Sequence, residues 1–392
     1  MVEEEWYNLD IKLEVYTQME RSTVYFTNMR TPIGTSLLTK MERLLKAANI
    51  QDIDFDQKFT AIKMHFGEPG NLSFLRPNFA KTVVDTVKNL GGRPFLTDCN
   101  TLYVGRRKNA LEHLDAAMEN GFSPLSTGCQ IMIADGLRGT DEQEVALTGT
   151  EYVHSAKIGR AIMDADVFIS LSHFKGHENT GFGGALKNIG MGCGSRAGKM
   201  EQHSAGKPEV HPEQCRGCRA CSKVCAHNAI SYGDDHKATI QHDRCVGCGR
   251  CIGICNFDAI SNWNVHSNDI LCKKMAEYAL AVVKDRPQFH ISIVMQVSPN
   301  CDCHSENDLP IIPDVGIFAS TDPVALDAAC ADMCNKMPVM PGSQLEDRMH
   351  TNDCDHHDHF INSAPETNWR VCLEHAEKIG VGTRNYELVT VK

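Results

Sequence analysis

Eight of the eighteen cysteines fall into two runs that share the spacing C-x2-C-x2-C-x3-C. The first run consists of Cys215, Cys218, Cys221 and Cys225, and the second of Cys245, Cys248, Cys251 and Cys255. Three closely spaced thiolates can bind three iron atoms of a [4Fe–4S] cube, while the fourth cysteine of each run binds an iron of the other cube. The spacing therefore predicts two [4Fe–4S] clusters.

The two runs belong to an internal repeat, because CRGCRACSKVCAHNAIS at 215–231 returns as CVGCGRCIGICNFDAIS at 245–261. Glycines inside each run, such as Gly217 and Gly247, let backbone N–H groups approach the cluster sulfides. A pair of structural zinc sites is the alternative interpretation. Zinc commonly uses two separated cysteine pairs and needs no third cysteine at the same pitch, so the repeat favours iron–sulfur clusters.

Residues 208–263 resemble the bacterial two-cluster ferredoxin module. The resemblance implies that one cluster is held by Cys215, Cys218, Cys221 and Cys255, and the other by Cys245, Cys248, Cys251 and Cys225. That family has proline after the last cysteine of each run, whereas Ala226 and Asn256 stand there in this chain. Since proline lacks a backbone N–H, we expect its absence to change the reduction potential without preventing cluster assembly.

The bulk composition limits the class of protein. The chain has 392 residues, 42% of them hydrophobic and 23% charged, which is typical of a globular protein. A net charge of −11 disfavours nucleic acid and anionic membranes as partners. No apolar run reaches the roughly 20 residues of a membrane-spanning helix. The first residues, MVEEEWYNLD, are acidic where a signal peptide would be basic, so we expect no signal peptide. Many cysteines without a secretory signal indicate a reducing cytoplasm, and we expect an anaerobic or microaerophilic host.

Short apolar strands and amphipathic helices alternate on both sides of the cysteine-rich segment. Strands are predicted from Ser22 and over 59–66, 93–98, 129–135, 166–174 and 289–297, and helices over 76–92, 107–121, 156–165, 277–285 and 322–336. This alternation predicts an α/β fold with a doubly wound, largely parallel sheet, and an inserted small α+β ferredoxin domain. The predicted parts are an N-terminal extension (1–21), a first α/β part (22–207), the insertion (208–263) and a second α/β part (264–392).

Parallel sheets bind ligands at the carboxyl ends of their strands, and the richest strand end lies within 166–199. It presents His173, Lys175, His177 and Lys187 around the glycine-rich string GFGG. We predict that the N–H groups at the following helix start face an anion or a carboxylate, with Lys187 as the countercharge. The spacing fits neither a Walker A loop nor a dinucleotide-binding turn. A tight loop packed beneath the insertion is the alternative.

A third metal is a further hypothesis. Cys301, Cys303 and His304 could bind zinc, nickel or iron, although a C-x-C pair can equally be a packing feature. The histidine-rich tract 350–360 is a metal site or a solvated loop. Helical spacing predicts core positions for Cys272, Cys330, Cys334 and Cys372.

Several strings resemble the family built on a domain of unknown function, DUF362. They are TDCNTLYVGRR (97–107), SHFKGHENTGFGGALKNIGMGCGSRAGK (172–199), CDCHSENDLPI (301–311) and IFASTDPVALDAA (317–329). The resemblance covers about residues 22–390 and implies an α/β domain with an embedded ferredoxin and redox chemistry. The string GFGGALKN (181–188) is also similar to the glycine–lysine loop of nickel-pincer lactate racemases.

The leading functional hypothesis is an iron–sulfur oxidoreductase that passes electrons from a redox partner protein through two clusters to a small ligand or metal cofactor. The residues expected to bind or protonate the substrate are His173, Lys175, His177 and Lys187, supported by Asp98, Asp322 and Asp327. One alternative is an electron carrier or adaptor that docks to a redox partner and performs no chemistry. Another is a non-redox lyase, racemase or metallocofactor-assembly protein.

Overall fold

The computed structural model of this chain covers most of the sequence. It describes residues 21–102, 105–204, 207–225, 227–245, 251, 255, 257, 259–261, 267–350 and 354–392. The predicted N-terminal extension therefore lies outside the described residues except for Arg21.

One eight-stranded sheet organises the α/β part, in the order β16-β1-β15-β14-β7-β2-β3-β4. Its strands are β1 (Ser22–Asn28), β2 (Phe59–Lys63), β3 (Arg93–Asp98), β4 (Ile131–Ile133), β7 (Val167–His173), β14 (Gln288–Val294), β15 (Gly316–Ser320) and β16 (Tyr386–Thr390). β15 is antiparallel to both of its neighbours, and the other pairings are parallel. The predicted α/β class with a largely parallel sheet is confirmed.

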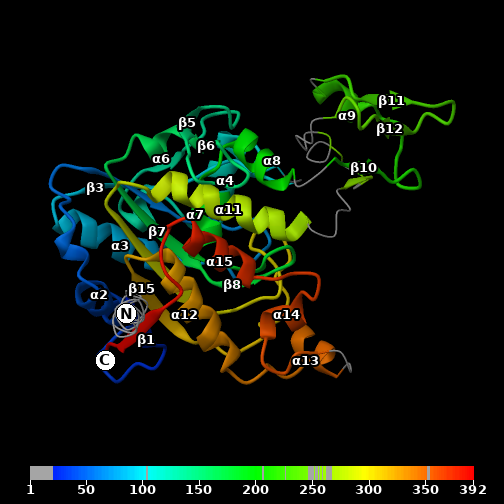
Figure 1. Cartoon of the computed structure of the whole chain (residues 1–392). Coiled ribbons are helices and arrows are strands. Elements are labelled where there is room, and N and C mark those ends of the chain that lie inside the picture. The colour runs from blue at the N-terminus through cyan, green and yellow to red at the C-terminus, as the bar shows by residue number, and fades with distance from the viewer. Residues whose placement is uncertain are drawn as a thin grey trace, which may run out of the picture.

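Helices cover both faces of this sheet, so that it has two separate hydrophobic cores (Figure 1). One face carries α2 (Leu37–Ala47), α3 (Pro77–Asn89) and α4 (Ala110–Glu119), and the other carries α7 (Ala185–Cys193), α11 (Ser267–Val283), α12 (Pro323–Asn335) and α15 (Arg370–Lys378). Successive residues of β7 alternate between the cores, since Phe168 packs in one and Ile169 in the other. Every residue of β7 is buried, as expected for a central parallel strand.

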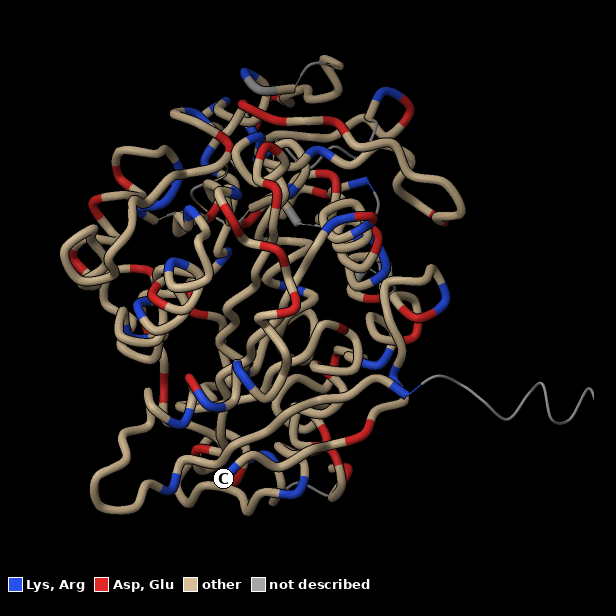
Figure 2. Tube along the Cα trace, turned by 90° about the vertical axis from the view of Figure 1, so that its left-hand side faces the viewer, with Lys and Arg blue, Asp and Glu red and all other residues tan. Residues whose placement is uncertain are grey.

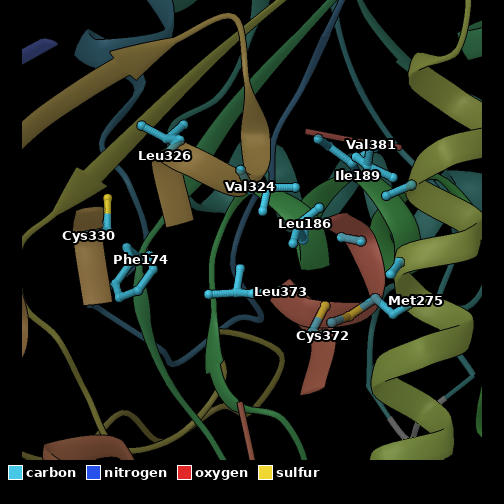
Figure 3. Close-up of a cluster of buried hydrophobic side chains, with 14 of the residues drawn as sticks. Phe174, Leu186, Ile189, Met275, Val324, Leu326, Cys330, Cys372, Leu373 and Val381 are labelled. Atoms are coloured by element: carbon cyan, nitrogen blue, oxygen red, sulfur yellow. The ribbon is translucent and has the colours of Figure 1, made fainter. Parts of the chain in front are cut away.

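The four helices α7, α11, α12 and α15 converge on one apolar cluster (Figure 3). Leu186 and Ile189 of α7 face Met275 of α11 and Leu373 of α15 in this cluster. The helices α7 and α11 cross so closely that a Cβ atom at Gly190 would overlap the backbone oxygen of Met275. Burial in the same core confirms the predicted packing role of Cys272, Cys330, Cys334 and Cys372.

The cysteine-rich segment forms its own small antiparallel elements (Figure 1). They are β10 (Glu209–Val210) paired with β13 (Ile260–Ser261), β11 (Ile230–Tyr232) paired with β12 (Ala238–Ile240), and α9 (Ala220–Val224). The β10–β13 pairing joins the two ends of the segment. The cysteine-rich segment follows α8 (Arg196–His203), and the chain re-enters the α/β part at α11. The predicted domain limits of 208 and 263 stay a prediction.

The helix predicted over 156–165 is wrong for its first half. Residues 155–159 form β6 (Ser155–Gly159), which pairs with β5 (Glu142–Ala146), and only the short α6 (Arg160–Met163) follows. In β6, Ala156 and Ile158 are buried while Lys157 between them is half-buried, a strand period of two. The remaining elements are η1 (Ile50–Asp52), α5 (Pro124–Thr127), β8 (Lys175–His177), β9 (Gly181–Gly183), α13 (Gln344–Met349) and α14 (His359–Ser363).

Lys and Arg are interspersed with Asp and Glu along the backbone trace in Figure 2. Among the described residues, no helix combines the length and the apolar character needed to cross a membrane.

Replacing Gly190 tests the close crossing of α7 and α11. A glycine-to-alanine change inside a helix normally stabilises a protein by about 1 kcal/mol. Gly190→Ala should instead lower the free energy of unfolding by about 2 kcal/mol, because the new methyl group overlaps the Met275 backbone. Urea denaturation followed by circular dichroism measures the change.

Gly380→Ala is the matched control, because its Cβ would meet no atom while its φ of +81° is unfavourable for alanine. It should cost about 1 kcal/mol through backbone strain alone. A Gly190→Ala variant that is as stable as the wild type or more stable would contradict the described crossing.

Candidate functional site

A pocket of about 690 Å³ opens at the carboxyl ends of β2, β3 and β7, beside the loop that follows β14. This is the edge at which parallel sheets bind ligands. Its chemically active lining consists of Lys63, His65, Asp98, Cys99, Arg107, His173, Lys175, Lys187, Asn188, Lys199, His203, Cys301 and Cys303. Three of the four predicted catalytic residues therefore share one pocket with the C-x-C pair.

The floor of the pocket is a buried ion pair between Lys63 at the end of β2 and Asp98 at the end of β3. The Lys63 Nζ lies 3.0 Å from an Asp98 oxygen and 2.8 Å from Asn188 Oδ1 on α7. Asn188 in turn donates to the Lys63 backbone oxygen at 3.0 Å. Burial alone would raise the pKa of Asp98, but the Lys63 ammonium holds that pKa well below its usual range. The pair thus fixes α7 against two strand ends.

A second ion pair joins Arg107 to Glu68, with 2.7 Å between Arg107 Nε and a Glu68 oxygen. Both side chains are buried. The same guanidinium lies 2.7 Å from the Nε2 atom of His65. Burial and the Arg107 charge hold the pKa of His65 well below its usual range, so His65 is a neutral imidazole at neutral pH.

Asp302, the residue between the two cysteines of the C-x-C pair, holds together the wall of the pocket formed by His173 and Lys175. One Asp302 oxygen lies 2.8 Å from His173 Nδ1 and 3.7 Å from Lys175 Nζ. Burial opposes ionisation of Asp302, but these two groups outweigh it and lower the pKa of its carboxyl. His173 Nε2 also lies 2.7 Å from the Met295 oxygen. Because both His173 nitrogens have partners, this histidine positions the loop.

Lys187 faces Cys301 across the pocket, with 3.5 Å between its Nζ and the Cys301 sulfur. Cys301 is buried, and the side chains of Cys303 and His177 stabilise its thiolate form. The Cys303 thiol, opposed by burial and reinforced by Lys187, lowers the pKa of Cys301 well below that of an ordinary thiol. The Cys301 sulfur and burial raise the pKa of Cys303. The fourth predicted catalytic residue, His177, therefore reaches the site through Cys301.

The start of α7 does not offer its N–H groups to a ligand, which corrects the prediction of an anion at this helix end. Asp327 of α12 accepts hydrogen bonds from the Ala185 and Leu186 backbone nitrogens at 2.6 and 2.8 Å. Gly184 permits this approach, since a Cβ there would overlap the carboxylate. Burial raises the pKa of Asp327 to about 7. Asp327 thus sets the position of α7 and of Lys187.

Asp322 has a structural role, because it caps α12 by accepting from Val324 and Ala325 nitrogens at 2.8 and 3.0 Å. Its other oxygen accepts from Ser22 Oγ and from the Thr383 nitrogen. Asp322 thereby joins the start of β1 to the residues just before β16, and it does not line the described pocket.

Positive charge exceeds negative charge around the pocket. Five cationic side chains line it: Lys63, Arg107, Lys175, Lys187 and Lys199. Three carboxylates contact them: Asp98, Glu68 and Asp302. Within the described part of the chain, neither Lys187 nor Lys199 pairs with a carboxylate. Lys199 is buried and donates to the Gly192 and Gly194 oxygens, while Lys187 contacts Cys301. This excess favours an anionic ligand.

Sequence reasoning did not identify Lys63, Arg107 or Lys199 as site residues. The signal for Lys63 was present, because it is the single charged residue in the apolar strand string FTAIKMHF. Arg107 lies in a loop and Lys199 in the short helix α8, and neither position carries a comparable local signal.

A second pocket, of about 330 Å³, lies in the cysteine-rich segment. Its lining includes Cys215, Cys218, Cys221 and Cys255, the four residues that the ferredoxin resemblance implies for one cluster. Backbone nitrogens point at thiolate positions, with Ala238 N 3.4 Å from the Cys215 sulfur and Ala229 N 3.3 Å from the Cys225 sulfur. Four thiols around one cavity with N–H donors fit a [4Fe–4S] cube. The second set is incomplete here, since Cys248 lies outside the described residues.

The predicted third metal has no assembled ligand set. Among the described residues, no group of three or more His, Cys, Asp or Glu side chains is arranged to hold a metal ion. The Nε2 atom of His304 lies 3.1 Å from a Glu178 oxygen, and the His304 side chain is partly exposed. In the tract 350–360, of which 351–353 lie outside the described residues, His359 Nε2 lies 2.8 Å from the Met337 oxygen. The third metal stays a prediction.

The model of a family called domain of unknown function DUF362 matches residues 60–332, which is more than half of the chain. This chain belongs to the DUF362 family. The match spans the strands β2, β3, β7 and β14 that carry the pocket, and the cysteine-rich segment within it. A comparison with curated proteins finds no match.

Two solved structures are similar to this DUF362 protein at low identity. The lactate racemase apoprotein from Thermoanaerobacterium thermosaccharolyticum is 13% identical, over 73% of this chain and 54% of that one, with a TM-score of 0.38. A crystal structure of a protein from Thermotoga maritima is 13% identical, over 77% of this chain and 59% of that one, with a TM-score of 0.39. This chain therefore spans little more than half the length of either structure.

Removing the Asp98 charge tests the buried pair at the pocket floor. Asp98→Asn leaves the Lys63 ammonium buried without a counter-charge, so the free energy of unfolding should fall by about 3 kcal/mol at pH 7. Because the folded-state pKa of Asp98 is depressed, its stabilisation exists at neutral pH and is lost in acid. The difference between wild type and variant should therefore shrink below about pH 4. Denaturant titrations at several pH values measure it.

The exposed pair Lys81–Asp85 supplies the control, with 2.8 Å between its charged atoms. Asp85→Asn should change the free energy of unfolding by less than about 0.5 kcal/mol, because water screens this pair. Equal costs for Asp98→Asn and Asp85→Asn would show that Lys63 and Asp98 are not a buried pair.

Proposed function

We propose that this DUF362 protein is an iron–sulfur oxidoreductase that acts on a small anionic substrate bound at the carboxyl edge of its sheet. The observation that carries the proposal is the excess of buried positive charge in the 690 Å³ pocket, with Lys187 and Lys199 lacking carboxylate partners among the described residues. Burying more ammonium and guanidinium groups than carboxylates is costly, and an anionic ligand would reduce that cost.

The cysteine-rich segment supports the redox part of the proposal. Four cysteines around one cavity, with backbone N–H groups directed at sulfur, suit a [4Fe–4S] cluster. Two such clusters would supply one-electron transfer steps between an external partner protein and the pocket. The chain itself connects the two parts, because the segment starts after α8, which contributes Lys199 to the pocket, and ends at α11, which packs on α7.

Each pocket residue has a distinct role in this proposal. Lys187 and Lys199 bind the negative charge of the substrate, and the Lys63–Asp98 pair holds the floor in place. His177 stabilises the Cys301 thiolate, and an imidazole so placed would transfer a proton to or from that sulfur. His173 fixes the loop of the C-x-C pair through Asp302.

The alternative of a carrier or adaptor requires no charged pocket in the α/β part. Docking to a redox partner would use surface residues, whereas the lysines of this site are buried or half-buried. A non-redox lyase, racemase or assembly protein would also bind an anion here, but it would not depend on the oxidation state of the clusters. Metal content and ligand binding separate these functions.

Elemental analysis of anaerobically purified protein tests the clusters. About eight iron atoms and eight acid-labile sulfides are expected per chain. Cys215→Ala should lose at least the roughly four irons of one cube, because it removes a thiolate from the cysteine cavity. Cys330→Ala is the control and should retain all iron, since Cys330 lies in the apolar core. Zinc in place of iron would contradict the proposal.

Calorimetric titration with oxalate and with inorganic phosphate tests the anionic ligand. The wild type should bind at least one of these probes, and Lys187→Met and Lys199→Met should each raise its Kd about tenfold, or about 1.4 kcal/mol. Lys81→Met, a change at an exposed lysine of α3, should leave the Kd unchanged. Lysine variants that bind both probes as well as the wild type would refute a substrate anion at this site.

A further inference from the structure

The pocket contains a second feature that anion binding does not use, which is the pair Cys301 and Cys303. Both residues line the pocket, separated by one residue in the chain and close to Lys187. A packing role does not require two cysteines beside a lysine in the lining of a pocket. The buried cysteines of the apolar core, such as Cys330 and Cys334, have no such surroundings.

The backbone holds the two cysteines in a turn. The His304 nitrogen donates to the Cys301 oxygen at 3.1 Å, which places Cys301 and Cys303 at the first and third positions of the turn. Such a turn keeps their α-carbons within the range that a disulfide can bridge. No disulfide joins the two cysteines in this structure.

Anchors on both sides of the turn fix its orientation. Asp302 is buried against His173 and Lys175, and its backbone oxygen accepts from the Glu68 nitrogen at 3.0 Å. The backbone of the preceding residues Ser298 and Pro299 packs directly against Gly176. A Cβ atom at Gly176 would lie only 2.8 and 2.6 Å from their oxygens, so the contact requires glycine. Because Asp302 is fixed to the wall, its two neighbouring cysteines are directed together toward the cavity.

Lys187 gives the pair an electrostatic bias, since its Nζ lies 3.5 Å from the Cys301 sulfur. An adjacent cation stabilises a thiolate. A thiolate exists only in the reduced pair, and stabilising the reduced form makes a disulfide easier to reduce. Cys303 is half-buried and lines the pocket, so small thiols and disulfides can reach it.

We propose that Cys301 and Cys303 form a reversible dithiol–disulfide couple in the pocket, which exchanges two electrons with the substrate or with the clusters. On oxidation the Cys301 thiolate and the Cys303 thiol form one S–S bond and release two electrons and one proton. On reduction the S–S bond accepts two electrons, and a proton returns to Cys303. Two [4Fe–4S] clusters would carry one electron each, which equals the two electrons of the disulfide. This equality rests on the proposed function, whereas the couple itself rests on the pocket geometry.

Equilibration in anaerobic glutathione buffers tests the couple in the full-length, cluster-loaded protein. After quenching with iodoacetamide, cleavage at glutamate gives the peptide 278–306, which contains Cys301 and Cys303 as its only cysteines. Mass spectrometry should show the unalkylated peptide, about 2 Da lighter than the dithiol, rising and falling reversibly with the glutathione ratio. Cys303→Ser and Cys301→Ser should each abolish this species.

The charge of Lys187 is tested in the same experiment. Lys187→Met should shift the equilibrium toward the disulfide about tenfold, which corresponds to roughly 30 mV for two electrons. Lys81→Met should not shift it. Reversible formation of the disulfide together with this shift supports the proposal. A pair that stays reduced at every glutathione ratio, that forms only mixed disulfides with glutathione, or that ignores Lys187→Met overturns it.

These outcomes separate the couple from the proposed function. Protein that lacks iron but still interconverts the pair would refute the oxidoreductase while sustaining the couple. Protein with two clusters and a permanently reduced pair would refute the couple and leave the oxidoreductase standing. In protein whose clusters are reduced with substoichiometric dithionite, loss of the electron paramagnetic resonance signal as the disulfide opens would establish transfer between them.

Discussion

Burial of more positive than negative charge around one pocket is the constraint on which the rest of this structure depends. Buried ammonium and guanidinium groups need partners, and the fold brings those partners from separate places in the sequence. Asp98 ends β3, Glu68 follows β2, and Asp302 follows β14. The parallel sheet makes this possible, because it ends several strands at one edge. Lys187 and Lys199 have no carboxylate partner among the described residues, and we propose that an external anion balances their charge.

The helix α7 connects this charged pocket to the apolar core. On one side it carries Lys187 and Asn188 into the pocket, and on the other it packs Leu186 and Ile189 against α11, α12 and α15. Asp327 holds its first turn through two backbone N–H groups. A lysine that must meet both a ligand and a thiol needs a fixed backbone, and this helix is fixed at its start, along its apolar side and at its crossing with α11.

The amino-acid sequence predicted the α/β class and the edge of the sheet at which the pocket lies. Both depend on local periodicity or on residue spacing. It placed His173, Lys175 and Lys187 in one site for the same reason. It could not show that Asp327 would occupy the start of α7, since that contact joins residues about 140 positions apart. Nor could it place Lys199, whose burial depends on packing of α8, or recognise β6, whose strand form depends on pairing with β5.

We propose that the DUF362 fold of this chain combines two iron–sulfur clusters with a cationic pocket for a small anion. An anaerobic crystal structure, determined with iron anomalous scattering from crystals grown with oxalate, tests both parts at once. We expect about eight iron sites at the eight repeated cysteines and oxalate in contact with Lys187 and Lys199. Iron absent from those cysteines, or oxalate bound away from both lysines while the pocket stays free of any anion, would refute the proposal.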